Sequence, residues 1–100
     1  MENKTYIDVL VENAKKSYAA LENYNQKQTD DLVRAIGKII YDNREMLSKE
    51  AMEETGLGVL AGKIAKHDKV TTSHWAYMKG KPSVGLIDID EINGIYTFAK

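Results

Sequence analysis

Residues 84–98 have the sequence VGLIDIDEINGIYTF, and this stretch decides the fold class. Branched and aromatic residues on both sides of its centre favour two strands, at 84–90 and 95–100. Asn93 and Gly94 both tolerate a positive φ, so together they predict a type I′ turn between the strands. A lone hairpin is marginally stable in water. The stretch therefore predicts a β-hairpin that extends a sheet formed elsewhere.

Four helical patterns precede the hairpin. The first begins at a capping box formed by Thr5 and Asp8, and the second begins at Asn25, to which Gln28 can bond in return. Both carry an apolar stripe with helical spacing, made by Ile7, Leu10, Val11, Ala14, Tyr18 and Leu21 in the first and by Leu32, Val33, Ile36, Ile39 and Ile40 in the second. We expect each stripe to pack against something larger than the helix itself.

The next helical boundary is set by a repeat of the cap spacing. Asp42 and Glu45 predict a third helix that ends near Gly56, although a kink at 41–43 would give the same pattern. Gly37 lies inside the second helix at a cost of about 1 kcal/mol against alanine, which indicates close approach by another backbone.

A fourth pattern follows Gly58 and ends at Gly80 and Pro82. Its repeating positions are Leu60, Ile64, His67, Thr71, Trp75 and Met78. We therefore expect a mainly α-helical segment of three to four helices, with a helical layer at residues 1–80 and a β-hairpin at 83–100. Helices followed by half a sheet indicate the beginning of an α/β domain.

Composition excludes several classes of function. The chain has 100 residues, of which 43% are hydrophobic, and its 14 basic and 15 acidic side chains leave a net charge of −1. This balance is typical of one soluble globular domain and gives no field that would attract a nucleic acid. The chain has no cysteine, which excludes thiolate metal sites and a cysteine nucleophile within it. Neither a membrane span nor a signal peptide is recognisable, so we expect a cytoplasmic protein.

Two motifs suggest a cofactor or metal site, and each has a simpler interpretation. Gly56, Gly58 and Gly62 form a run one residue longer than the dinucleotide-binding fingerprint, and a helix precedes it where a strand is required. We interpret the run as helix termination and close packing. His67 and His74 lie seven residues apart on one helical face, but two ligands do not complete a zinc site. We interpret them as capped or partly buried histidines.

Three further groups of side chains also receive structural interpretations. Asp88 and Asp90 alternate with isoleucines, as expected for the solvated face of a strand. Ser73 stands next to His74 without a third group to orient a nucleophile and its base. We assign the aromatic and methionine side chains at helical spacing to packing, namely those of Trp75, Tyr77 and Met78.

Three stretches of this sequence resemble the N-terminal part of an aldehyde dehydrogenase. They are YNQKQTD at 24–30, MEETGLG at 52–58, and SVGLI at 83–87 with the acidic turn that leads to Gly94 and Ile95. The resemblance is greatest to the CoA-acylating branch, which includes acetaldehyde and succinate-semialdehyde dehydrogenases, and it covers nearly the whole chain. It implies an α/β parent fold of Rossmann type, in which a cysteine thiolate adds to the aldehyde, hydride passes to NAD or NADP, and coenzyme A accepts the acyl group.

The resemblance also implies a role for this segment. Residues 1–100 would be a single N-terminal segment of the NAD(P)-binding and oligomerisation region, with the rest of the parent chain as partner and a homo-oligomer formed through the hairpin region. No nucleic acid or membrane partner is expected. We assign no catalytic, cofactor-binding or metal-ligating residue, place NAD or NADP and coenzyme A in the parent, and expect the isolated chain to be inactive.

Two alternatives remain open at this point. One is a small, self-contained helical interaction module without enzyme activity, which would bind through the stripe at 7–21 or through the hairpin edge. The other is a semialdehyde dehydrogenase that does not use coenzyme A. The sequence leaves undecided which aldehyde is used, whether NAD or NADP is preferred, whether an alcohol dehydrogenase domain follows, and whether the chain naturally ends at Lys100.

Overall fold

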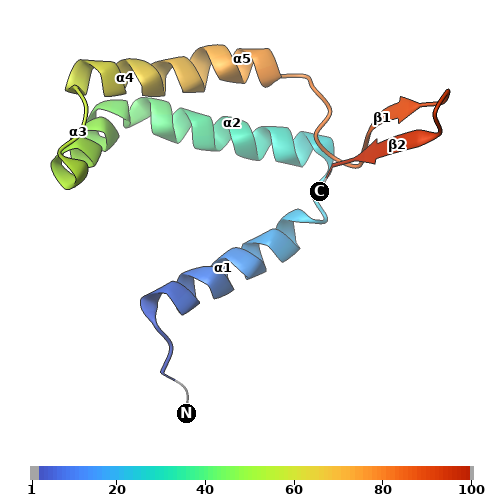
Figure 1. The fold of residues 1–100 in the computed structure, drawn as a ribbon, viewed down its shortest axis with the longest axis horizontal. Helices are drawn as coiled ribbons and strands as arrows, with labels where there is room; N and C mark the ends of the chain where they lie inside the picture. Colours follow the sequence, from blue (N-terminus) through green and yellow to red (C-terminus); the bar gives the residue numbers. More distant parts are fainter. Residues whose placement is uncertain (1–2, 100) are drawn as a thin grey trace. The chain divides into compact units, whose positions relative to one another are not determined.

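The computed structural model describes residues 3–99 and has helices followed by one antiparallel hairpin (Figure 1). The elements are α1 (Tyr6–Leu21), α2 (Gln26–Asp42), α3 (Arg44–Thr55), α4 (Leu60–Lys69), the π-helix η1 (Val70–His74), α5 (Trp75–Met78), β1 (Leu86–Asp90) and β2 (Ile95–Phe98). The predicted order of helices and hairpin is confirmed, while residues 1–2 and Lys100, which the predicted ranges include, lie outside the described part of the chain. The chain forms two compact units, one made by residues up to Thr29 together with those from Ser83 onward, the other by Asp30–Pro82.

The first two helices begin where their capping residues predict. Thr5 Oγ1 accepts a hydrogen bond from the Asp8 backbone N–H at 3.2 Å, and the Asp8 carboxylate accepts one from the Thr5 N–H at 2.9 Å. Asn25 and Gln28 exchange the same pair of bonds, at 2.8 and 3.0 Å. The bonds from Thr5 lower the pKa of the Asp8 carboxyl below its usual 3.8, because they stabilise the ionised form.

The cap predicted for the third helix is wrong. Asp42 is the last residue of α2, where its carboxylate pairs with Lys38 Nζ at 2.6 Å instead of capping α3. α3 follows after Asn43, whose side chain donates back to the Ile39 carbonyl at 2.8 Å. The end of α3 matches the prediction, since Gly56 has a left-handed φ of 67° and donates its N–H to the Met52 carbonyl.

In the unit formed by residues 30–82, α2 runs antiparallel to one long helical run made of α4, η1 and α5 (Figure 1). α3 connects the C-terminal end of α2 to the N-terminal end of α4. Residues 70–74 are wound as a π-helix, in which Thr71 and Thr72 return their hydroxyl hydrogen bonds to the backbone carbonyls of His67 and Asp68. A Cβ at Gly37 would meet no described atom within 4 Å, so the close backbone approach expected at this residue is not found.

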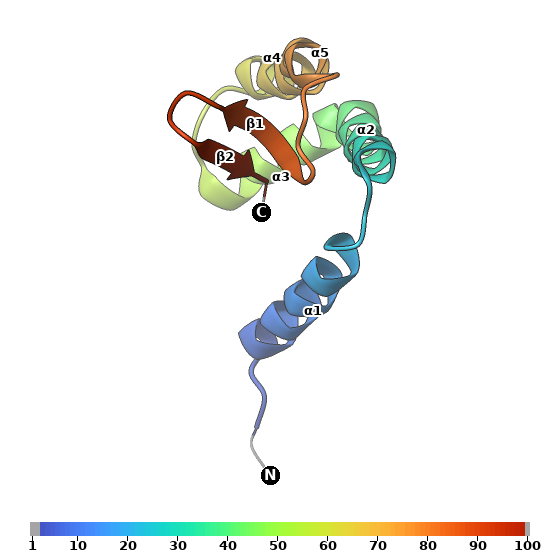
Figure 2. The same cartoon turned by 90° about the vertical axis from the view of Figure 1, so that its right-hand side faces the viewer.

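The hairpin forms, but its turn differs from the prediction. Asp90 pairs with Ile95, which leaves residues 91–94 as the loop, and in the described part of the chain only glycines, among them Gly94, have a positive φ (Figure 2). A type I′ turn through Asn93 is therefore wrong. The Asp90 carboxylate accepts bonds from the Asn93 side-chain amide at 2.8 Å and from its backbone N–H at 3.1 Å. This bonding favours the longer loop.

The described residues have no buried hydrophobic side chain. Ser48 is the one buried residue among them, with an exposed fraction of 0%. Every residue of α1 is exposed, and Ile92 at the hairpin tip is 95% exposed. A large exposed apolar area marks a surface that another element or protein covers. Within residues 3–99, no helix combines the length and the apolar character that a membrane crossing requires.

Candidate functional site

The most enclosed polar contact in the described chain joins α3 to α4. The Ser48 hydroxyl oxygen lies 2.9 Å from His67 Nδ1, and the same nitrogen lies 2.8 Å from the Lys63 carbonyl oxygen. Ser48 is fully buried and His67 is half-buried. The interpretation of His67 as a partly buried histidine is therefore confirmed.

The geometry of this contact excludes a serine nucleophile activated by His67. A carbonyl oxygen only accepts, so Nδ1 must carry a proton that it donates to Lys63. A nitrogen that already carries this proton cannot also take the proton of Ser48, whereas a catalytic histidine uses its two nitrogens for these two tasks. Ser48 and His67 therefore hold α3 against α4.

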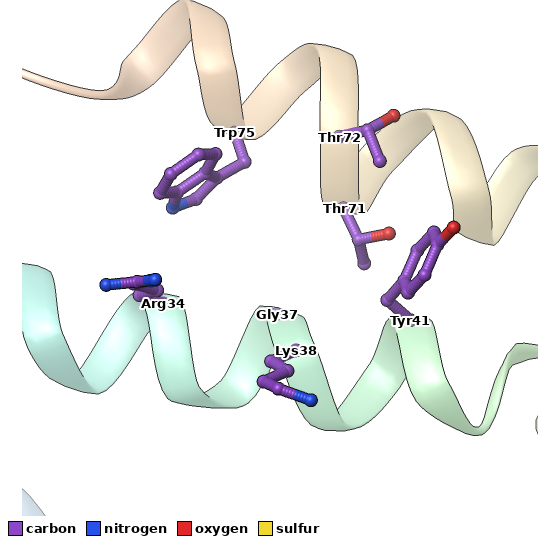
Figure 3. Close-up of a pocket in the computed structure, with 7 residues that line it drawn as sticks. All are labelled: Arg34, Gly37, Lys38, Tyr41, Thr71, Thr72 and Trp75. Atoms are coloured by element: carbon purple, nitrogen blue, oxygen red, sulfur yellow. The ribbon is translucent and has the colours of Figure 1, made fainter.

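A groove of about 300 Å³ lies between α2 and the helical run from α4 to α5 (Figure 3). Trp75 and Thr71 point from the helical run toward α2, while Tyr41 points back from α2. The lining residues are Arg34, Gly37, Lys38, Tyr41, Thr71, Thr72 and Trp75. This set contains no carboxylate and no imidazole, and the side chains in it that could exchange a proton are those of Lys38 and Tyr41.

Several polar groups that line the groove are already bonded within the chain. The hydroxyl protons of Thr71 and Thr72 are already donated to backbone carbonyls, and Lys38 is paired with Asp42. Lys79 lies over the Trp75 ring, 5.1 Å from its centroid. Trp75 is half-buried, in agreement with its assignment to packing, whereas Tyr77 and Met78 are exposed in the described part of the chain, so their assignment stays a prediction.

The other sequence candidates are not brought together. His74 is exposed, so the partly buried interpretation is wrong for this residue. No group of three or more metal-binding side chains occurs among residues 3–99. Gly56 and Gly58 end α3 and lead into α4 with positive φ, as the interpretation as helix termination predicts.

The hairpin has two different faces and two different edges. Leu86 pairs with Phe98 and Ile89 with Tyr96, so these apolar side chains share one face, while Asp88 and Asp90 lie on the other. Asp88 is exposed, Asp90 is half-buried and the apolar face is exposed too, so the interpretation of the two aspartates as a solvated face stays a prediction.

The edges differ in their capacity to pair. A β-bulge between Leu86 and Asp88 interrupts β1, which also carries two charged aspartates. β2 has the sequence IYTF, without charge, proline or a described bulge. Bulges and charges block edge pairing, so the β2 edge is the open one.

Curated proteins similar to this chain are aldehyde dehydrogenases. The chain is 42% identical over its full 100 residues to a succinate-semialdehyde dehydrogenase (acetylating) from Clostridium kluyveri. It is 39% identical over 92 residues to a sulfoacetaldehyde dehydrogenase (acylating) from Bilophila wadsworthia, and 28% identical over 98 residues to a bifunctional aldehyde-alcohol dehydrogenase from Escherichia coli K12. No protein-family model matches the chain.

The similarity covers 100%, 90% and 98% of this chain but a small part of each relative. The chain spans 22%, 20% and 11% of the lengths of these three proteins. The identities of 42% and 39% confirm the resemblance to acylating aldehyde dehydrogenases that three sequence stretches indicated.

Proposed function

We propose that this chain is the N-terminal part of an NAD(P)-dependent, CoA-acylating aldehyde dehydrogenase that works in the cytoplasm. The parent would convert an aldehyde, coenzyme A and NAD or NADP into an acyl-CoA and the reduced nucleotide. The observation that carries the proposal is 42% identity over all 100 residues to an acetylating succinate-semialdehyde dehydrogenase.

The catalytic groups of the proposed reaction belong to other parts of the parent. The thioester chemistry needs a cysteine, and this chain contains none. The glycine run at 56–62 follows helix α3, and a dinucleotide fingerprint requires a strand at that place. This glycine run therefore lacks the strand context of a dinucleotide-binding fingerprint, and no catalytic step is assigned to this segment.

The contribution of this segment would be structural. The apolar residues of α1 are exposed, as are Val33, Ile36 and Ile39 of α2, and exposed apolar stripes are stabilised when another surface covers them. The partner that fits best is the rest of the parent chain, because the relatives are about five times as long as the aligned segment.

The hairpin would contribute to association of the subunits into a homo-oligomer. It offers an apolar face through Ile89 and Tyr96 and an open edge along β2. An isolated two-stranded hairpin is marginally stable, so pairing with a further strand would stabilise it.

The reaction is tested by measuring reduced nucleotide formation in the intact natural protein. We expect formation of NADH or NADPH from a short-chain aldehyde or semialdehyde to depend on added coenzyme A. The 100-residue chain alone should give none. Equal rates with and without coenzyme A would contradict the acylating proposal and favour the branch that does not use it.

A second candidate is a self-contained interaction module, which the continuous exposure of α1 favours. The stripe that contains Ile7 and Tyr18 would then bind a partner protein. One measurement distinguishes the two candidates, namely unfolding of the isolated 100-residue chain. Only a self-contained module should unfold cooperatively, as a defined oligomer, in the absence of any further part of a parent protein.

A further inference from the structure

One side chain ties the start of α2 to the start of the hairpin. Gln26 Nε2 donates a hydrogen bond to the Ser83 hydroxyl oxygen at 2.8 Å. Gln26 Oε1 accepts bonds from the backbone N–H groups of Ser83, at 2.8 Å, and of Val84, at 3.2 Å. Both segments belong to the same compact unit, although 57 residues separate Gln26 from Ser83.

These bonds reach backbone groups of residues 83–84, which lie outside the hydrogen-bonded ladder between β1 and β2. The link from α5 to β1 contains Pro82 and two glycines with positive φ, Gly80 and Gly85. The N–H groups of Ser83 and Val84 precede β1, so the hairpin does not pair them. Backbone donors require partners, and Gln26 supplies one for both.

We call the three hydrogen bonds between Gln26 and residues 83–84 the joint. The joint leads directly into the hairpin. Gly85 follows Val84, and its carbonyl accepts a bond at 2.8 Å from Ala99, which follows β2. A displacement of residues 83–84 is therefore transmitted to the base of both strands. Two of the three stretches that carry the family resemblance, 24–30 and 83–87, also meet at this joint.

We propose that Gln26 is a positioning residue for subunit association, and that its amide holds the hairpin in the orientation in which the β2 edge meets a second copy of the protein. This inference rests on the proposed function of the hairpin in a homo-oligomer. Gln26 itself does not touch the partner.

The test uses three variants of the intact natural protein. Gln26→Leu keeps the size of the side chain and removes all three bonds, whereas Gln26→Glu keeps an acceptor for both N–H groups, and the Ser83 hydroxyl can turn to donate to it. Gln28→Leu is the matched control, because Gln28 bonds to Asn25 in the same helical turn and not to the hairpin link.

Two measurements are made on each variant, namely amide hydrogen exchange at Ser83 and Val84 and the dissociation constant of the oligomer by analytical ultracentrifugation. In Gln26→Leu we expect exchange at both amides to become about fivefold faster, and the dissociation constant to rise at least about fivefold. Gln26→Glu should match the wild-type protein in both measurements, and Gln28→Leu, which removes only a cap bond at the start of α2, should change both by less than Gln26→Leu does.

The outcomes test separately the hydrogen bonds of Gln26 and their role in subunit association. Unchanged exchange in Gln26→Leu would overturn the joint itself. Faster exchange with an unchanged dissociation constant would overturn its role in association while the proposed oligomer stands. A wild-type protein that sediments as a monomer would instead overturn the proposed homo-oligomer on which this inference rests, before any variant is compared, and would leave the proposed reaction untouched.

Discussion

At the scale of single residues, the contact between Ser48 and His67 stabilises the packing of α3 on α4. The hydroxyl is fully buried, and it shares His67 Nδ1 with the Lys63 carbonyl oxygen. A buried polar group costs free energy unless it is hydrogen-bonded, so this contact constrains where the two helices meet.

Substitution of Ser48 should affect stability and not chemistry. We expect Ser48→Ala to lower the free energy of unfolding by about 1 kcal/mol, because a buried hydrogen bond is lost. Ser73→Ala, at an exposed position, should change it by less than about 0.5 kcal/mol. Urea unfolding of the intact protein measures both values. A loss of activity in Ser48→Ala at native stability would contradict the structural role.

Asp90 makes the hairpin loop sensitive to acid. Hydrogen bonds from the side chain of Asn93, and then from its backbone, lower the pKa of the Asp90 carboxyl below 3.8. The native state therefore binds this proton less readily than the unfolded state, so the stabilisation is complete above about pH 4 and is lost as the pH falls through the lowered value.

This pH dependence is tested by carbon-13 NMR of the Asp90 carboxyl. In Asn93→Ala we expect the pKa to move up toward 3.8, since the largest cause of the shift is removed. Asn23→Ala, at an exposed site outside the hairpin, is the control. An identical Asp90 pKa in both variants would show that Asn93 does not hold the carboxylate.

At the scale of helices and strands, Gly56 at the end of α3 and Gly62 inside α4 should respond to alanine substitution in opposite directions. Gly56→Ala forces a side chain into the left-handed region, at a cost of about 1 to 2 kcal/mol. Gly62→Ala lies inside α4 with no described atom within 4 Å of the new Cβ, and should stabilise by up to about 1 kcal/mol.

Thermal unfolding of the intact protein should separate the two alanine variants. A lower melting temperature is expected for Gly56→Ala and a higher one for Gly62→Ala. A lower melting temperature for Gly62→Ala would reveal that another segment of the intact protein packs against this face of α4.

Local signals in the sequence predicted most helix and strand boundaries. The caps at Thr5 and Asn25 and the left-handed end at Gly56 depend on residues within four positions of one another, so the sequence contains the whole interaction. Local signals gave a wrong prediction where the side chain concerned bonds to a residue other than the predicted one. Asp42 pairs with Lys38 and does not cap α3, and Asp90 bonds to Asn93 and so favours a longer loop.

The contacts of the candidate site could not be predicted in the same way. Ser48 and His67 are 19 residues apart, and Gln26 and Ser83 are 57 apart, so neither pair has a local spacing that would reveal it. The one available signal was the position of His67 on the repeating face of its helix. The π-helix at 70–74 was indicated only by the adjacent Thr71 and Thr72, which are weak helix formers.

At the scale of the whole molecule, stability should depend on surfaces outside residues 3–99. Without buried hydrophobic side chains in this range, little apolar area offsets the loss of chain entropy. We expect the isolated 100-residue chain to unfold without a sharp transition and to bind a hydrophobic dye. Calorimetry and dye fluorescence measure this. A cooperative transition would favour the self-contained interaction module.

The exposure of α1 and α2 has a consequence during protein synthesis in the proposed parent. At about 5 to 20 residues per second, the rest of a relative of which this segment is 22% takes roughly 20 to 70 s to leave the ribosome. Non-specific collapse takes microseconds, so the apolar stripes of the nascent helices are accessible long before their covering surfaces exist. We therefore expect chaperones to bind this segment while the proposed parent is still being synthesised.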